Sequence, residues 1–163
     1  MIKNLLLCTL TLLVFASCKK KGCTDCNAIN YSARANADDN TCEFVNEEYI
    51  GWYVVSDSIL GPPSMEWDTN SYEMNITRSI CEPNNLLLSN YADLSNSFRG
   101  INFQVNCTVT DSTFSIPSQL VEKEKIRQSS GYFSDDSVFF DIEFENEFGE
   151  VFIGKTFGVK KYR

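Results

Sequence analysis

The sequence contains no histidine, and its basic residues are outnumbered, with 14 Lys and Arg against 22 Asp and Glu. Without an imidazole the chain can form neither a Ser-His-Asp nor a Cys-His catalytic arrangement, and it cannot hold zinc through histidine. The resulting net charge of −8 argues against nucleic acid or another extended polyanion as a partner.

Carboxylate pairs could still perform acid–base chemistry in such a chain. The adjacent acidic pairs lie in turn-like or flanking stretches, where solvated turn residues are expected; they are Asp38–Asp39, Glu47–Glu48 and Asp135–Asp136. We therefore expect a protein that is not an enzyme and that uses no cofactor. An enzyme would require two carboxylates that meet in a pocket.

The apolar run at the N-terminus is too short for a transmembrane helix, which needs about 20 residues. This run, Leu5–Phe15, has 11 residues, follows the single charge of Lys3 and precedes the small residues Ala16 and Ser17. A basic start, a short apolar stretch and small residues before a cleavage point are typical of a secretory signal, here residues 1–17.

The residues Phe-Ala-Ser-Cys that end this run resemble the lipobox of bacterial lipoproteins, in which the cysteine is acylated and becomes the first residue. The resemblance implies that Cys18 carries lipid chains, which anchor a protein stably because each buried methylene contributes about 0.8 kcal/mol. Lys19–Lys21 would lie against anionic headgroups. A lysine after the cysteine implies sorting to the outer membrane, and exposure to the periplasm or to the cell surface stays open.

Residues 22–44 are rich in Asn, Asp, Ala and Thr and poor in large apolar side chains, so disulfides are expected to hold them in a secreted chain. They resemble a short segment common in lipoproteins and surface proteins of the Bacteroidota, on the matching residues Gly22, Cys23, Thr24, Asp25, Ala28, Asn30, Tyr31, Ala35, Asp38, Asp39 and Cys42. That resemblance implies a Cys23–Cys42 bridge, which contributes about 3 kcal/mol in the chain-entropy picture. Cys26 stands where the usual form of the segment has proline.

Cys23 and Cys26 also spell a C-x-x-C motif. A redox site would need this motif at the start of a helix beside a strand, whereas here it lies in a polar stretch. Three nearby cysteines are too few for a zinc site, and we expect no metal centre. Calcium prefers oxygen ligands such as the Asp and Asn side chains of this segment, but turn capping accounts for them about as well, so calcium binding stays open.

From residue 44 onward apolar and polar residues alternate, which is typical of half-buried antiparallel strands. The regular stretches are 72–80, 101–109, 138–145 and 151–159, with shorter runs at 49–57, 85–89, 112–116 and 126–134. Residues 120–128 carry charges that a helix could present, but the segment is short and flanked by strands. The predicted parts of the chain are a signal peptide (1–17), a lipidated, disulfide-stapled segment (18–43) and a β domain (44–163).

About eight strands at meander spacing predict an all-β fold, with an antiparallel up-and-down barrel favoured over a sandwich. Three stretches resemble the small lipocalin-like domains of Bacteroidota lipoproteins, with residues 49–58 as the first strand, 114–119 as a middle strand and 152–162 as the last. Gly51 and Trp52 adjoin here, whereas the lipocalin signature separates its Gly and Trp by one residue.

Strand alternation assigns the faces of the predicted sheet. The inward side chains that we expect are mostly bulky, namely Trp52, Phe103, Phe140, Ile142, Phe144 and Phe157. Cys107 also falls on an inward row, and we favour a Cys81–Cys107 bridge, which requires the strand to bend at Cys81. In the alternative, Cys26 joins Cys81 and Cys107 stays in the core as a small hydrophobe.

Three Asp-Ser pairs followed by Thr or an apolar residue resemble O-glycosylation sites of exported proteins in this bacterial group. They imply modification at Ser58, Ser112 or Ser137, although Asp-Ser is also ordinary turn chemistry.

Two functions fit these observations. In the first, a non-catalytic, lipid-anchored envelope protein uses its β domain to bind another envelope protein or a glycan, with exposed aromatics such as Tyr53, Trp67 and Phe139 as candidate contacts. In the alternative, a lipocalin-like carrier holds a small apolar ligand, which requires a hollow mouth with a few polar groups. The bulky inward residues favour a filled interior, and therefore the first function.

Overall fold

The computed structural model describes residues 19–63, 65–94 and 103–162. The chain divides into two compact units between residues 44 and 45, and each unit is described by itself. The predicted signal peptide, the predicted lipidation site Cys18 and Ile101 of a predicted strand lie outside the described residues.

The second unit consists mainly of antiparallel strands, as the alternating pattern predicts. The strands that the structure describes are β1 (Gly51–Gly61), β2 (Glu66–Arg78), β3 (Asn85–Ser89), β4 (Gln104–Thr110), β5 (Thr113–Ile116), β6 (Gln119–Val121), β7 (Glu124–Ile126), β8 (Ser129–Ser134), β9 (Ser137–Glu145) and β10 (Val151–Lys160). Short 3-10 helices precede β1 and follow β3, as η1 (Glu47–Tyr49) and η2 (Tyr91–Asp93).

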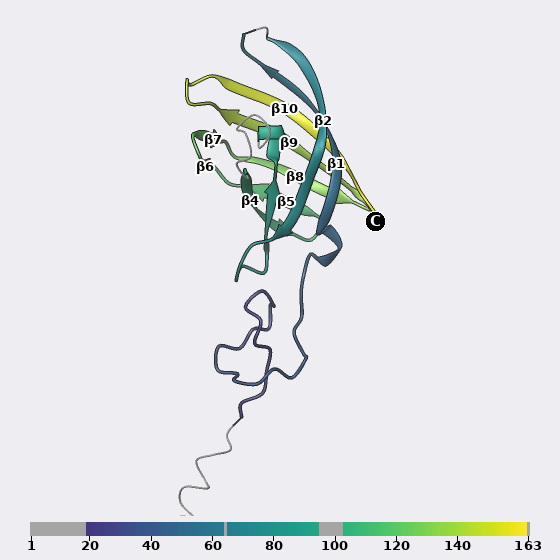
Figure 1. Cartoon of the computed structure of the whole chain (residues 1–163), viewed down its shortest axis with the longest axis vertical. Coiled ribbons are helices and arrows are strands. Elements are labelled where there is room, and N and C mark those ends of the chain that lie inside the picture. The colour runs from purple at the N-terminus through teal and green to yellow at the C-terminus, as the bar shows by residue number, and fades with distance from the viewer. Residues whose placement is uncertain (1–18, 64, 95–102, 163) are drawn as a thin grey trace, which may run out of the picture. The chain divides into compact units, whose positions relative to one another are not determined.

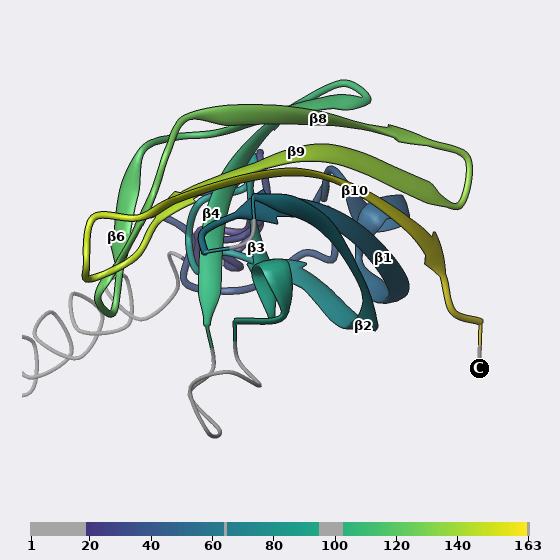
Figure 2. The same cartoon turned by 90° about the horizontal axis from the view of Figure 1, so that it is seen from above.

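Eight of these strands close into a barrel (Figure 1). The order is β10, β1, β2, β3, β4, β5, β8 and β9, with every neighbouring pair antiparallel, and β9 pairs again with β10 to complete the ring. In Figure 2, β8, β9 and β10 run side by side along one wall, and β1 continues the sheet from β10. The prediction of a lipocalin-like antiparallel barrel is therefore confirmed.

Large side chains fill the middle of this barrel. The inward rows predicted on β4 and β9, and the row on β2 as far as Ile76, are confirmed for the described residues, since their side chains are buried: Tyr72, Met74, Ile76, Phe103, Val105, Cys107, Val109, Val138, Phe140, Ile142 and Phe144. Tyr91 of η2 is also fully buried and stacks on Phe140, with 5.7 Å between the ring centroids. These side chains occupy the middle of the barrel, where a carrier would need a hollow for its ligand. The prediction that Ile80 continues the row of β2 is wrong, because β2 ends at Arg78 and Ile80 is 82 % exposed in the turn that follows.

The faces predicted for β1 and β10 are wrong at two positions. Trp52 is 40 % exposed and Phe157 is 44 % exposed, so both point outward rather than inward. Gly154 and Gly158 occupy the inward row of β10 instead. A side chain at Gly154 would place its Cβ 2.4 Å from the backbone oxygen of Ser58, because β10 lies too close to β1 for anything larger than glycine.

Residues 119–126 form a hairpin, β6–β7, rather than a helix. β7 pairs with the end of β9 in the register Lys125 with Glu145 and Ile126 with Phe144. On the other side, the amide of Gln119 accepts a hydrogen bond from the backbone N–H of Asn106 and donates one to its carbonyl oxygen, both at 2.9 Å. This side chain therefore links the hairpin to β4 in the way that a strand would.

The first unit contains the predicted Cys23–Cys42 disulfide, which is confirmed. Its carboxylates cap turns: Asp25, Asp38 and Asp39 each accept a hydrogen bond from the backbone N–H two residues later, at 2.9 to 3.2 Å. Turn capping therefore accounts for these acidic residues, as one of the two interpretations of this segment predicts.

The predicted Cys81–Cys107 bridge is wrong. Cys107 is a fully buried free thiol that lies opposite Leu86 of β3 and faces the interior of the barrel. Cys81 follows the end of β2 in an exposed turn, where its backbone has a φ of 59°. Cys26 and Cys81 are both disulfide-bonded, as the alternative pairing predicts.

Candidate functional site

A groove of about 1020 Å³, called the outer groove here, is lined mostly by outward-facing residues of β1, β2, β4, β5, β8, β9 and β10. Five residues of the inward rows also line it, namely Asp57, Phe114, Gly131, Phe140 and Thr156. Hydroxyl side chains dominate its lining. They are the Ser and Thr residues Ser56, Ser58, Thr69, Thr108, Thr110, Thr113, Ser115, Ser130 and the buried Thr156, together with Tyr132. The exposed charges of the lining are those of Lys155 and Asp141, which lie opposite each other on β10 and β9. The outer groove therefore presents many groups that both donate and accept hydrogen bonds, with little net charge.

Three aromatic rings cross the outer groove as a row, here called the aromatic row: Tyr132 on β8, Phe139 on β9 and Phe157 on β10. The strand register places Phe139 opposite both of the others. The ring centroids lie 4.8 Å apart between Tyr132 and Phe139 and 5.0 Å apart between Phe139 and Phe157. Tyr132 is 49 % exposed at one end of the row, and the half-exposed Phe157 ends the other.

Small hydroxyl residues flank the aromatic row in the same register. Thr113 of β5 lies opposite Tyr132, and Ser56 of β1 lies opposite Phe157. The outer ring faces of the two end residues therefore border short polar side chains. Beyond Ser56, Val54 pairs with Val159, and both are exposed, which extends the apolar surface along β1 and β10.

A second pocket, of about 570 Å³, lies at one mouth of the barrel and is called the mouth pocket here. Its walls are apolar at Ile59, Pro62, Pro63, Leu94, Phe144, Phe148 and Phe152 and polar at Glu66, Asp68, Asn70, Glu124, Asn146 and Glu147. Phe144 and Phe152 stack on each other, with ring centroids 4.8 Å apart. The two pockets share no lining residue.

Glu124 is the most buried polar residue of the mouth pocket, with only 3 % of its surface exposed. Its Oε2 atom makes no hydrogen bond to the residues that the structure describes. Burial raises the pKa of this carboxyl group, and the nearby charge of Glu147 raises it further. A buried carboxylate without a donor is costly, which makes Glu124 the polar group of this pocket that most lacks a partner.

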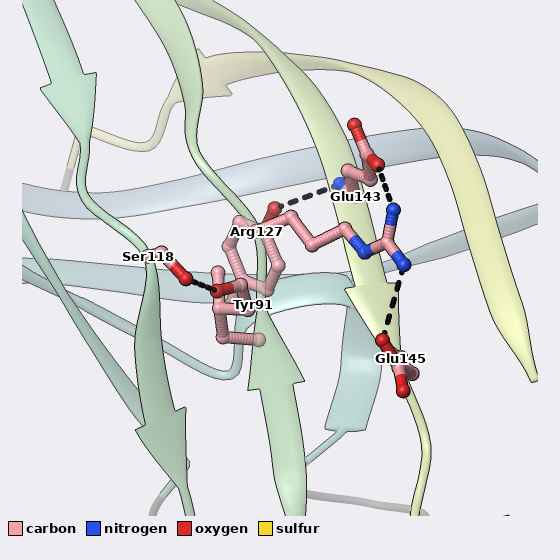
Figure 3. A network of polar contacts seen from close by, with 6 residues as sticks. Tyr91, Ser118, Arg127, Glu143 and Glu145 are labelled. Atoms are coloured by element: carbon pink, nitrogen blue, oxygen red, sulfur yellow. Dashed lines mark hydrogen bonds and ion pairs between the residues drawn. The ribbon is translucent and has the colours of Figure 1, made fainter. Parts of the chain in front are cut away.

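The hairpin that carries Glu124 is held firmly to β9 (Figure 3). Arg127, just after β7, forms ion pairs with Glu143 and Glu145 of β9, both at 3.1 Å. Ser118 donates a hydrogen bond to the carbonyl oxygen of Ile126 at 3.2 Å and so ties the start of β6 to the end of β7, at the same open end of the hairpin. The structure thus provides a defined position for the Glu124 carboxylate.

A buried polar cluster lies inside the barrel at Asp57 of β1. Its carboxylate accepts hydrogen bonds from the Tyr72 hydroxyl at 2.8 Å and from the Thr156 hydroxyl at 2.7 Å. Burial raises the pKa of Asp57 to about 6, although both hydrogen bonds oppose that rise. Asp57 was not among the predicted site residues; its inward position between Val55 and Ile59 is the signal that could have revealed it.

The three residues predicted to contact a partner lie in different environments in the structure. Phe139 lies in the outer groove, and Trp67 is exposed on β2, but Tyr53 is buried inside the barrel and cannot contact a partner. Tyr132 and Phe157, which the sequence analysis did not propose as contacts, complete the aromatic row. The sequence does contain a signal that Phe157 points outward. The small residues Gly154, Thr156 and Gly158 alternate with it along β10 and take the inward positions.

The predicted O-glycosylation sites differ in accessibility. Ser112 is exposed in the turn between β4 and β5, whereas Ser58 and Ser137 are half-buried in strands. Ser58 also lines the outer groove. Modification of these residues stays a prediction, and Ser112 is the most accessible of the three.

Within the described residues, no group of three or more His, Cys, Asp and Glu side chains is placed to hold a metal ion. Four carboxylates line the mouth pocket, so acidic residues do meet in a pocket, and the absence of catalysis stays a prediction. No helix in the described part of the chain is long and apolar enough to cross a membrane.

The fold defines a lipocalin-like β-barrel with a hydroxyl-rich outer groove and an acidic mouth pocket. Comparisons with protein-family models, with curated proteins and with solved structures find no match for the chain. Its function is therefore argued from these two sites.

Proposed function

We propose that this protein is a non-catalytic binding protein of the bacterial envelope, anchored by lipid at Cys18, and that the outer groove of its barrel binds a neutral glycan. The aromatic row carries this proposal. It places three rings in register across β8, β9 and β10 within a groove whose other walls are mainly hydroxyls.

The chemistry of a sugar ring matches these two kinds of surface. Its C–H faces pack against aromatic rings, and its rim of hydroxyls exchanges hydrogen bonds with Ser and Thr, which both donate and accept. The half-exposed end rings, Tyr132 and Phe157, border the short side chains of Thr113 and Ser56, so a sugar can approach the outer ring faces. Opposed charges at Asp141 and Lys155 leave the groove without a strong preference for an anion or a cation.

The filled interior argues against the alternative function in the form of a carrier whose small apolar ligand lies deep inside the barrel. Phe140, Ile142 and Tyr91 are all buried where such a ligand would lie. An apolar ligand would have to displace well-packed side chains. The free-energy cost of that displacement exceeds the free energy gained by burying the ligand. The mouth pocket is hollow, but its four acidic residues disfavour a purely apolar ligand there.

The test is binding of purified protein to an array of neutral and charged glycans, followed by calorimetry with the best ligand. We expect the double variant Tyr132→Ser/Phe157→Ser to lose binding at least about tenfold, because stacking of each ring contributes roughly 1 kcal/mol. Leu120→Ser is the matched control, since Leu120 is exposed on β6 away from the outer groove.

Three results would count against a glycan. One is unchanged affinity in the double variant, and another is an equal loss in Leu120→Ser. A third is capture of an envelope protein, and of no glycan, in a manner that depends on Phe157, which would make the outer groove a protein contact instead.

A further inference from the structure

The mouth pocket combines apolar walls with charge of one sign. Its charged lining residues are all acidic, namely Glu66, Asp68, Glu124 and Glu147. One nearby cation, Lys123, pairs with Glu147 at 2.7 Å, but Lys123 does not line the pocket. The pocket therefore has an excess of negative charge and favours a positively charged ligand.

The position of Glu124 points to a specific contact within this pocket. Its carboxylate is almost completely buried, and Oε2 has no hydrogen-bond donor among the described residues. Buried carboxylates are normally paired, since an unpaired one costs free energy. The hairpin that carries Glu124 is fixed by the Arg127 ion pairs and by β7–β9 pairing, so the carboxylate is held in place without a protein partner.

The surrounding walls favour an organic cation over a metal ion. Across the described ranges of the chain, no group of three or more His, Cys, Asp and Glu side chains is placed to hold a metal ion, whereas Phe144, Phe148 and Phe152 supply aromatic surface to the same pocket. Aromatic faces attract ammonium groups, and apolar walls favour a ligand with an apolar body. A volume of about 570 Å³ matches the usual size of a small-molecule site.

We propose that the mouth pocket binds an organic ammonium ion with an apolar body, whose N–H group donates a hydrogen bond to the Glu124 carboxylate. This ligand differs in class from the neutral glycan of the outer groove and from the purely apolar ligand of the carrier hypothesis. The inference does not rest on the proposed function, because the two pockets have no residue in common.

The test is calorimetry of the purified protein with three probes of one size and different charge: 2-phenylethylammonium, 2-phenylethanol and 3-phenylpropionate. We expect the ammonium to bind at least about tenfold more tightly than the alcohol, which corresponds to the strength of one charge-assisted hydrogen bond. The carboxylate probe should not bind measurably, because it meets acidic residues only.

Glu124→Gln keeps the shape of the side chain but removes its charge, and it should weaken ammonium binding at least about tenfold without changing the affinity for the alcohol. Glu122→Gln is the matched control, since Glu122 is exposed in the turn of the same hairpin and does not line the pocket. The effect of Glu124→Gln should persist in higher salt, because buried pairs are screened little.

Equal affinities of the wild type for the ammonium and the alcohol would overturn the proposal, as would Glu124→Gln binding the ammonium like the wild type. If Glu124→Gln fails to fold, as judged by circular dichroism, the comparison of the three probes on the wild type still decides the question. Glycan binding by the outer groove should be unaffected by Glu124→Gln, which separates this test from that of the proposed function.

Discussion

The stability of this protein should depend on pH through Asp57, in a direction opposite to that of an ordinary surface carboxylate. Asp57 is 2 % exposed, and burial raises its pKa from 3.8 to about 6, with a smaller contribution from the charge of Asp93. Hydrogen bonds from Tyr72 and Thr156 oppose this rise but do not cancel it.

The sign follows from the two states of the protein. The folded state binds the proton of Asp57 more tightly than the unfolded state does, because the folded pKa is the higher one. The stabilisation is therefore complete below the unfolded pKa of 3.8 and is lost as the pH rises through about 6. Since one pKa unit corresponds to about 1.4 kcal/mol, the full loss is about 3 kcal/mol, of which about 2 kcal/mol falls between about pH 4 and about pH 7.

Urea unfolding followed by circular dichroism would measure this effect, because the exposed Trp52 and Trp67 are poor fluorescent reporters of unfolding. Asp57→Asn removes the titrating group and keeps the shape of the side chain. We expect the unfolding free energy of the wild type, relative to that of the variant, to fall by about 2 kcal/mol from about pH 4 to about pH 7. The other carboxylates titrate in both proteins, so their effect on the unfolding free energy cancels in this difference. A difference that does not change with pH would show that the pKa of Asp57 is not raised.

Two further substitutions and one labelling experiment test the packing. Gly131→Ala should lower the unfolding free energy by about 3 kcal/mol in urea titrations, because the new Cβ would lie 2.3 Å from the Phe114 ring and 2.4 Å from the backbone oxygen of Phe139. Gly149→Ala, with a φ of 80° and open space around it, should cost only about 1 kcal/mol, and equal losses in the two variants would contradict the packing argument. Burial raises the pKa of Cys107 to about 12, so iodoacetamide should label it only in the unfolded protein, as read by mass spectrometry; labelling of the native protein would show that the thiol is accessible.

The strands of the barrel were largely predictable because alternation is a local property of the sequence. The row of Phe103, Val105, Cys107 and Val109 against polar neighbours admits only one burial pattern, and the structure has that pattern. The β6–β7 hairpin was not predictable in the same way. Three residues per strand are too few to establish a period, and the hairpin is held by tertiary contacts from Gln119 and Arg127 instead.

The faces of β1 and β10 could not be assigned from hydrophobicity alone. On β1 both rows contain apolar residues, so Trp52 and Tyr53 compete for the interior. On β10 the inward row is Gly154, Thr156 and Gly158, which a rule that places apolar residues inside assigns to the solvent. Glycine at alternate positions of a strand is the sequence signal of a close backbone approach, and it would have reversed the prediction.

The pockets were the part of the structure least accessible to sequence reasoning. The aromatic row joins residues from three strands, and its register depends on how the barrel closes. Glu124 appeared in the sequence as one charge of a Lys-Glu-Lys run, and only the pairing of β7 with β9 buries it. Both sites therefore depend on which strands pair with each other. The residue pattern within one segment carries no information about that pairing.

The outward apolar residues of β10 bear on the proposed function because they do not belong to the buried core of the barrel. The inward row of β10 consists of Gly154, Thr156 and Gly158. The outward positions 157 and 159 could therefore be polar without placing a polar side chain inside the barrel. Phe157 and Val159 instead leave more than two fifths of their surface in solvent, opposite Ser56 and Val54. Large contiguous apolar patches on a protein surface often mark interaction sites. Phe157 lines the outer groove, so its exposed ring is consistent with the proposal that this groove binds a ligand.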